Sequence, residues 1–121
     1  MKEPDLPRII ELALSTLSER ERRSSAAYLD IKELDAGATF LVGRKEITSP
    51  ARGYLAFVDP TPTANWGHPC RYVLIESATG RVHEFPAQFP PFLREVAPTL
   101  RLIWKGADVP DAVLPTPLPP A

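Results

Sequence analysis

The stretch from Gly53 to Phe85, GYLAFVDPTPTANWGHPCRYVLIESATGRVHEF, constrains the fold more than any other part of the chain. Its first apolar run, Tyr54 to Val58, is too short for a buried helix and rich in aromatic and β-branched residues, so it predicts a strand. Arg71 to Glu76 repeats this pattern. The turn residues Ser77 to Gly80 then reverse the chain, and Arg81 to Phe85 returns alongside as the second half of a β-hairpin.

Neither apolar run alternates cleanly between apolar and polar residues, which predicts a sheet covered on both faces. We expect a helix on one face and a loop or a partner on the other. Asp5 and Pro7 have the spacing of a helix N-cap and a first-turn proline. The residues that follow form one apolar stripe at helical spacing, namely Leu6, Ile9, Ile10, Ala13, Leu14 and Leu17.

The remaining segments complete an α+β pattern. Ser18 and Glu21 have capping-box spacing, which marks the start of a second helical segment. Ala38 to Val42 predicts a first strand and Leu100 to Trp104 a last edge strand, whereas Ala27 to Leu34 fits a helix end or a strand equally well. The predicted fold is an N-terminal helix packed on a four- to five-stranded antiparallel sheet, with a short helix over 91–96.

Length and proline content predict one domain and a tail. A chain of 121 residues is large enough for a modest core without disulfide or metal staples. Its 15 prolines are about twice the average share, and five of them lie between 110 and 121. We therefore expect a single α+β domain over 1–107 and a Pro-rich tail over 108–121.

Charge and motif content disfavour several functional classes. The 14 basic and 15 acidic residues nearly cancel, so neither nucleic acid nor an acidic membrane surface is an expected partner. The glycines form no phosphate-binding loop, and we expect no cofactor. Acidic Glu3 and Asp5 stand where a secretory leader is basic, and an apolar run of about 18 residues for a membrane span is missing, which predicts a cytoplasmic protein.

The segment Trp66-Gly67-His68-Pro69-Cys70 carries the strongest chemical signal. A Cys and a His together can act as nucleophile and base. In the competing interpretation, Cys70 is buried at the start of a strand and His68 shapes the loop. The predicted hairpin places His83 roughly 14 Å from Cys70 along the sheet, too far for a triad. We therefore assign no catalytic residue and expect no enzyme.

Metal ligands and paired carboxylates are also not predicted. His68, Cys70 and His83 give at most three ligands, and their spacing matches no common metal site. The acidic residues of the sheet region, Asp59, Glu76 and Glu84, fall at predicted strand ends, where exposure to water is the ordinary explanation.

The loop from Pro60 to Pro69 is the candidate contact surface. Trp66 either closes the core or serves as an exposed anchor, since Trp and Tyr dominate the energetic centres of interfaces. Arginines beside the loop can provide charge complementarity. The partner-binding residues that we predict are Arg52, Tyr54, Asn65, Trp66, His68 and Arg71.

The order of these features resembles a bacterial immunity-protein family of polymorphic toxin systems that also includes a small chaperone-like protein. The matching pieces are Gly53 to Phe57, Pro69, the run from Val73 to Val82, and a closing helix over 91–96. Glu76 and Tyr54 replace the Asp and Trp of the family pattern. The hairpin residues Thr79 to Val82 also resemble the strand-turn-strand of inhibitory protease propeptides.

These resemblances imply a protein that sterically occludes a toxin or a peptidase without catalysing a reaction. Two other classes stay open on the residues themselves. One is a small Cys/His-dependent enzyme. The other is a small-ligand-binding domain with an apolar cavity between helix and sheet, under Leu14 and Phe57. The sequence leaves the oligomeric state and the identity of the partner undetermined.

Overall fold

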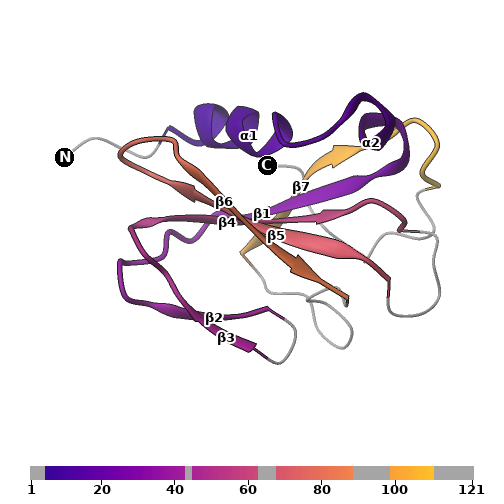
Figure 1. Cartoon of the computed structure of the whole chain (residues 1–121). Coiled ribbons are helices and arrows are strands. Elements are labelled where there is room, and N and C mark those ends of the chain that lie inside the picture. Colours follow the sequence, from indigo (N-terminus) through magenta and orange to yellow (C-terminus); the bar gives the residue numbers. More distant parts are fainter. Residues whose placement is uncertain (1–4, 43–44, 63–67, 89–98, 111–121) are drawn as a thin grey trace.

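The computed structural model describes residues 5–42, 45–62, 68–88 and 99–110. Within them the chain forms α1 (Leu6–Leu14), α2 (Glu19–Ser24), β1 (Ala26–Asp30), β2 (Thr39–Val42), β3 (Lys45–Thr48), β4 (Gly53–Asp59), β5 (Cys70–Glu76), β6 (Val82–Ala87) and β7 (Leu100–Lys105). Five of the strands form one antiparallel sheet in the order β6-β5-β4-β1-β7, and β2 pairs with β3. The two helices lie above the sheet and the β2–β3 hairpin lies below it (Figure 1). The predicted α+β class is thereby confirmed.

The helices begin where the capping signals placed them. The Asp5 carboxylate accepts a hydrogen bond from the Arg8 amide at 3.2 Å, and a proline occupies the first turn of α1. At the start of α2, Ser18 and Glu21 form both bonds of a capping box. The helix α1 ends at Leu14, but Leu17 beyond it is still buried.

The β5–β6 hairpin has the predicted turn. The Gly80 backbone has φ of +74°, a conformation that favours glycine, and its amide donates to the Glu76 carbonyl at 2.9 Å. The register places Leu74 opposite His83, four residues along β5 from Cys70. On the other side of β5, a Cβ atom at Gly53 would lie 2.4 Å from the Ile75 carbonyl oxygen, so β4 can approach β5 there only with glycine.

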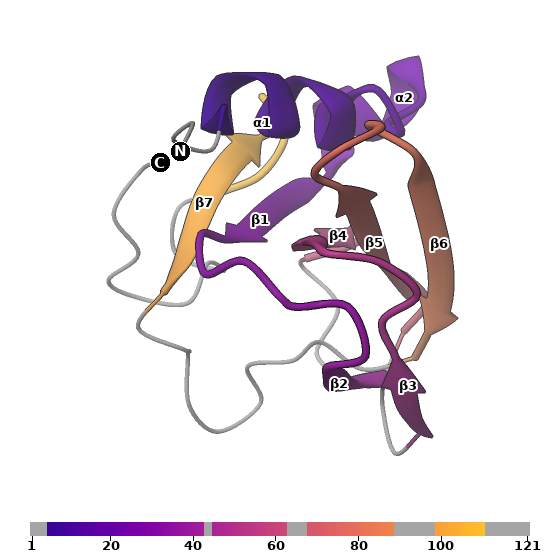
Figure 2. The same cartoon turned by 90° about the vertical axis from the view of Figure 1, so that its left-hand side faces the viewer.

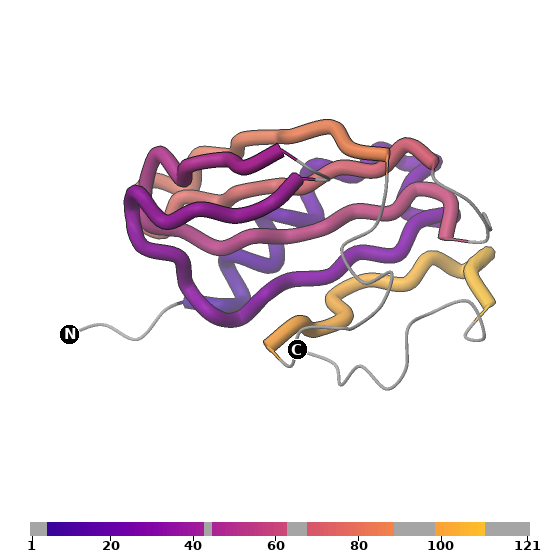
Figure 3. The backbone as a smooth tube through the Cα atoms, turned by 90° about the horizontal axis from the view of Figure 1, so that it is seen from below, coloured from indigo at the N-terminus to yellow at the C-terminus, as the bar shows by residue number. Residues whose placement is uncertain are grey.

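The sheet separates two apolar clusters, which confirms that both faces are covered. The cluster under α1 contains Ile9, Ala13, Leu17, Ala27, Leu29, Tyr54, Ala56, Val58, Val73 and Ile75. The opposite cluster contains Ala26, Tyr28, Val42, Phe57, Cys70, Tyr72 and Leu100, with Phe40 and Ile47 of the β2–β3 hairpin packed against it. Seen from below, the hairpin crosses in front of β5 and β6 (Figure 3).

One predicted strand occupies a different place. The segment containing Ala38 to Val42 was expected in the sheet, but β2 belongs to the two-stranded hairpin instead. In the five-stranded sheet, β1 lies between β4 and β7. It is part of the segment whose pattern fitted a helix end or a strand equally well. The burial pattern gives the reason. Four consecutive residues of β1 are buried, whereas β2 exposes Thr39 and Leu41 to solvent.

Residues at and after the end of β7 donate hydrogen bonds to carbonyl groups at the C-terminal end of α2. The last carbonyl groups of a helix lack partners within the helix. Here the Trp104 indole donates to the Arg22 carbonyl at 2.8 Å, and the amides of Gly106 and Asp108 donate to the carbonyls of Ser25 and Arg23. Figure 2 shows β7 running beside β1 toward the helical layer.

The folded unit continues past the expected domain boundary. Val109 is 3% exposed, so 108–109 belong to the fold, two residues beyond the predicted limit of 107. The rest of the predicted Pro-rich tail, 111–121, and the predicted helix over 91–96 lie outside the described residues. Within the described part of the chain, no helix has both the length and the apolar character needed to cross a membrane.

Candidate functional site

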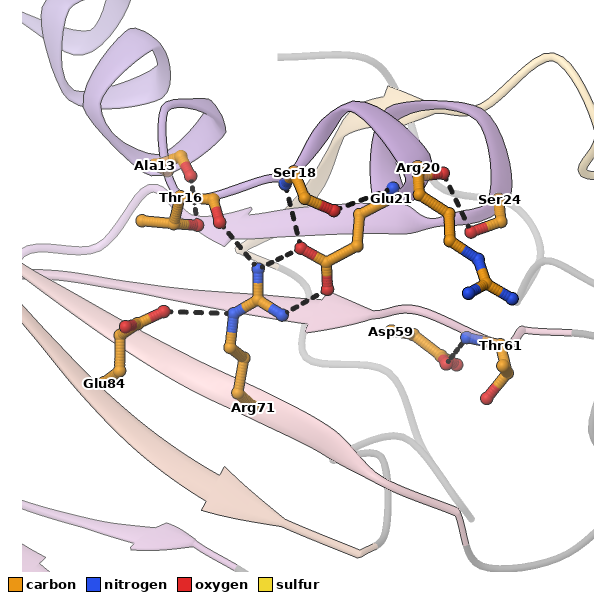
Figure 4. Close-up of polar contacts among 10 residues, drawn as sticks. All are labelled: Ala13, Thr16, Ser18, Arg20, Glu21, Ser24, Asp59, Thr61, Arg71 and Glu84. Atoms are coloured by element: carbon orange, nitrogen blue, oxygen red, sulfur yellow. Dashed lines mark hydrogen bonds and ion pairs between the residues drawn. The ribbon is translucent and has the colours of Figure 1, made fainter.

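The connection between β4 and β5 is closed at its base by a buried contact between a carboxylate and an imidazole. Asp59 ends β4 and His68 lies two residues before β5, and both are buried. The His68 Nε2 atom lies 2.7 Å from the Asp59 Oδ1 atom. The same oxygen accepts the Thr61 amide at 3.0 Å (Figure 4). Asp59 therefore holds both ends of the connection.

A second bond ties this connection to the neighbouring strand. The His68 amide donates to the carbonyl of Gln88, just after β6, at 2.7 Å. The interpretation of Asp59 as an ordinary solvated strand-end residue is wrong, because only 4% of this residue is exposed. A buried carboxylate is tolerated where hydrogen bonds and an opposite charge replace its water.

Cys70 lies beside this pair as the first residue of β5. Burial raises the pKa of the Cys70 thiol to about 11, and the Asp59 charge adds to the rise. The same two effects raise the pKa of the Tyr28 phenol on β1. Cys70 is therefore protonated at neutral pH, the opposite of an activated thiolate.

Arg71 faces the helices on the other side of the sheet. Its guanidinium donates to both Glu21 oxygens, at 2.7 and 3.1 Å, and to the Thr16 carbonyl at 3.0 Å (Figure 4). Its Nε atom lies 3.2 Å from the Glu84 carboxylate. The Arg71 hydrogen bond holds the pKa of the Glu21 carboxyl below its usual range, against the opposing effect of burial.

A hollow of about 370 Å³ lies at this end of the sheet, lined by Glu21, Pro60, Pro69, Cys70, Arg71, Glu84 and Pro86. Two of its lining prolines are the first and last residues of the predicted contact loop. The hollow has the volume of a ligand pocket. The charged groups that line it, Glu21, Arg71 and Glu84, already form ion pairs with one another.

The structure divides the predicted partner-binding residues between two ends of the sheet. His68 and Arg71 lie at the β4–β5 connection, but His68 is buried against Asp59. Arg52 lies at the opposite end, beyond the Gly53–Glu76 pair, where it contacts Glu33 at 3.5 Å. With about 3.4 Å per residue, the length of β4 separates these ends by roughly 20 Å.

Tyr54 belongs to the core. It is 1% exposed and packs under α1, so its side chain offers no surface to a partner. Asn65 and Trp66 lie outside the described residues, and their assignment stays a prediction. Leu14 and Phe57, expected together under a ligand cavity, pack on opposite faces of the sheet.

Sequence reasoning missed Asp59 and the second role of Glu21. A local signal existed for Asp59, since Asp59-Pro60-Thr61 is the pattern of a turn in which the Asp side chain accepts the amide two residues on. Glu21 was recognised as a capping residue. Its bidentate contact with Arg71 joins positions 50 apart, a pairing that local spacing cannot reveal.

Within the described residues, His, Cys, Asp and Glu side chains form no group of three or more suited to a metal ion. No family model, curated protein or solved structure matches the chain.

Proposed function

We propose that the chain is a non-enzymatic protein-binding domain of the immunity or inhibitor kind, which acts in the bacterial cytoplasm by sterically occluding a toxin or a peptidase. The β4–β5 connection supplies the contact, with Asn65 and Trp66 as its central residues and Arg71 beside its base. The observed order of α1, β4, connection and β5–β6 hairpin supports this proposal, because it matches the layout that resembles immunity proteins.

The observation that carries the proposal is the buried Asp59–His68 pair. It joins the two ends of the connection through Asp59, His68 and Thr61. A loop held at its base loses less conformational entropy on binding than a loop with free ends, and this raises affinity. The prolines at both ends limit the backbone further.

The same pair bears on the Cys/His alternative. A thiol enzyme needs an imidazole that can take the Cys proton and a thiolate that forms near neutral pH. His68 directs Nε2 to Asp59, and Cys70 has a raised pKa. Both observations support binding over thiol catalysis.

The test is capture of a partner by tagged full-length protein from its native lysate, with Trp66→Ala and Arg52→Ala captured in parallel. We expect a stoichiometric toxin- or peptidase-like protein with the unsubstituted chain. Trp66→Ala weakens binding about 30-fold or more, the effect of losing an interface anchor. Arg52→Ala, at the far end of the sheet, retains the partner.

Cooperative urea unfolding of each variant separates binding from folding. Retention of the partner by Trp66→Ala contradicts the loop assignment. Unfolding of Trp66→Ala instead places Trp66 in the core, and the proposed contact then loses its anchor.

A further inference from the structure

The hollow of about 370 Å³ at the β4–β5 end lies against β6, an edge strand of the five-stranded sheet. Pro86 of β6 pairs with Arg71 of β5, and Glu84 lies two residues before Pro86 on the same face. The Glu84 side chain is 53% exposed, so solvent reaches the hollow. Its volume is near the lower limit for ligand pockets and therefore suits one protruding side chain.

The charged groups that line the hollow carry one negative charge in excess. Glu21 and Glu84 are carboxylates, and Arg71 is the single cation among the lining residues. The Arg71 guanidinium lies between the two carboxylates (Figure 4). Its two Nη atoms donate to both oxygens of Glu21 and to the Thr16 carbonyl. Arg71 is thus bound mainly to the helical side.

Glu84 is held more loosely than Glu21. The Arg71 Nε atom lies 3.2 Å from Glu84, but it forms no hydrogen bond with any of the described residues, so this contact is one of charge alone. The Glu84 side chain is also more exposed, at 53% against 23% for Glu21. Exposed pairs of this kind contribute little, so Glu84 can turn toward an incoming cation at small cost.

The prolines of the hollow disfavour an anion and suit a long cationic side chain. Pro60, Pro69 and Pro86 have no backbone N–H and therefore offer no amide donor to an anion. Their rings provide apolar surface instead. A methylene stem can pack against such surface while its charged end stays in water.

We propose that this hollow binds an arginine side chain of the protein partner. The arginine stem packs on the proline rings, and the guanidinium forms a charge-assisted pair with Glu84. Arginine is favoured over lysine because its guanidinium is more weakly hydrated and can bind a carboxylate through two hydrogen bonds. This inference rests on the proposed function, to which it adds the chemistry of the partner residue beside the β4–β5 connection.

Blocked amino acids test the hollow on the free, full-length protein. In an NMR titration, N-acetyl-arginine amide should give saturable shifts at the Cys70, Arg71 and Glu84 amides. The Gly53 amide, at the opposite end of the sheet, should not shift. N-acetyl-citrulline amide, the neutral isostere, should bind about tenfold or more weakly, because it lacks the charge. Equal binding of both probes, or no saturable shift at the three amides, overturns the proposal. Tighter binding of the equivalent blocked lysine overturns the choice of arginine.

Two matched variants locate the binding site. Glu84→Gln removes an exposed carboxylate from the hollow, and Glu19→Gln removes one from α2 outside the hollow. We expect Glu84→Gln to weaken binding of the arginine probe about tenfold and Glu19→Gln to change it less than about twofold. Equal losses would mean that the probe responds to general acidity and would overturn the site. Should Glu84→Gln fail to fold, the comparison of arginine with citrulline on the unsubstituted protein still decides.

Partner capture is a separate measurement. If the arginine probe fails while the protein still captures a toxin or peptidase through Trp66, the arginine site is overturned and the proposed function stands. Failure to capture any partner counts against the proposed function, whereas the probe titration decides the chemistry of the hollow by itself.

Discussion

Two histidine–carboxylate pairs lie at opposite ends of the same sheet and have the same contact chemistry. In each, a His Nε2 atom meets a carboxylate oxygen, at 2.7 Å for His68–Asp59 and 2.5 Å for His83–Glu76. The side chains of the first pair are 10% and 6% exposed, and those of the second are 28% and 15% exposed. Asp59 of the first pair also accepts the Thr61 backbone amide, whereas the second pair lies on a hairpin that the Gly80–Glu76 backbone bond already closes.

This difference shows that contact distance alone does not rank ion pairs. Water screens an exposed pair and solvates either partner when the other is lost, so such a pair contributes little. A buried pair contributes modestly while intact, but loss of one partner leaves an uncompensated charge and is strongly destabilising. The Asp59–His68 pair should therefore be sensitive to substitution and the Glu76–His83 pair tolerant.

The largest expected effect is that of Asp59→Ala, which removes the buried carboxylate that contacts His68 and accepts the Thr61 amide. We expect a loss of about 3 kcal/mol in the free energy of unfolding. Urea denaturation at pH 7 measures it. Glu76→Ala is the matched substitution at the less deeply buried pair and should cost less. Equal losses from the two substitutions would show that burial does not separate the pairs.

The second expected effect concerns the reactivity of Cys70 beside the buried pair. Because its pKa is about 11, two units above the ordinary value of 9.0, its thiolate population at neutral pH is about 100-fold lower than that of a free thiol. Alkylation by iodoacetamide should be slower by at least that factor and should rise toward pH 11. Alkylation as fast as that of free cysteine at pH 7 would instead support the interpretation of the chain as a Cys/His-dependent enzyme.

A third ion pair, about as buried as the Glu76–His83 pair, extends the comparison. Arg71→Ala removes the partner of Glu21 and Glu84 and should cost about 2 kcal/mol at pH 7. The Glu21 pKa is lowered in the fold, so its stabilisation is complete above its ordinary value of 4.5 and disappears as the pH falls through the lowered value. The difference between wild type and variant should therefore shrink below about pH 4.5. Denaturation at pH 7 and in acid tests this, and a constant difference would contradict it.

The smallest effect is expected from Glu76→Gln. The hydrogen bond from His83 lowers the Glu76 pKa, so this residue too stabilises the fold above the ordinary value of 4.5, and the contribution disappears as the pH falls. The free energy of unfolding of the variant should fall slightly less on acidification than that of the wild type. The hydrogen-exchange rate of the Thr61 amide should be unchanged. Loss of Thr61 protection in Glu76→Gln would mean that the two ends of the sheet are coupled.

The parts of the fold that were predictable follow from local chemistry. The Asp5 cap, the Ser18–Glu21 capping box and the Gly80 turn each depend on residues within a few positions of one another. The strand β1 was ambiguous because its apolar residues suit either structure, and only its pairing with β4 and β7 decides between them. Tertiary contacts of this kind override propensity.

The candidate site was predictable only in part, for the same reason. The sequence singled out the β4–β5 connection through its Trp, His and Cys, and the alternative of a buried strand-initial Cys70 is what the structure has. That His68 points to Asp59 depends on where β4 ends relative to β5, a matter of strand register. Arg52 and Arg71 were grouped by charge, although the antiparallel arrangement places them at opposite ends.

The hydrogen bonds from the end of β7 to α2 set an order of events during synthesis. Trp104 and Arg22 are 82 residues apart, so α2 cannot gain these partners until β7 has left the ribosome. At 5–20 residues per second this interval is about 4 to 16 s. Throughout it, β1 also lacks its β7 neighbour and presents an unpaired edge. The contacts that complete α2 and cover this edge of β1 therefore form only after β7 has been translated.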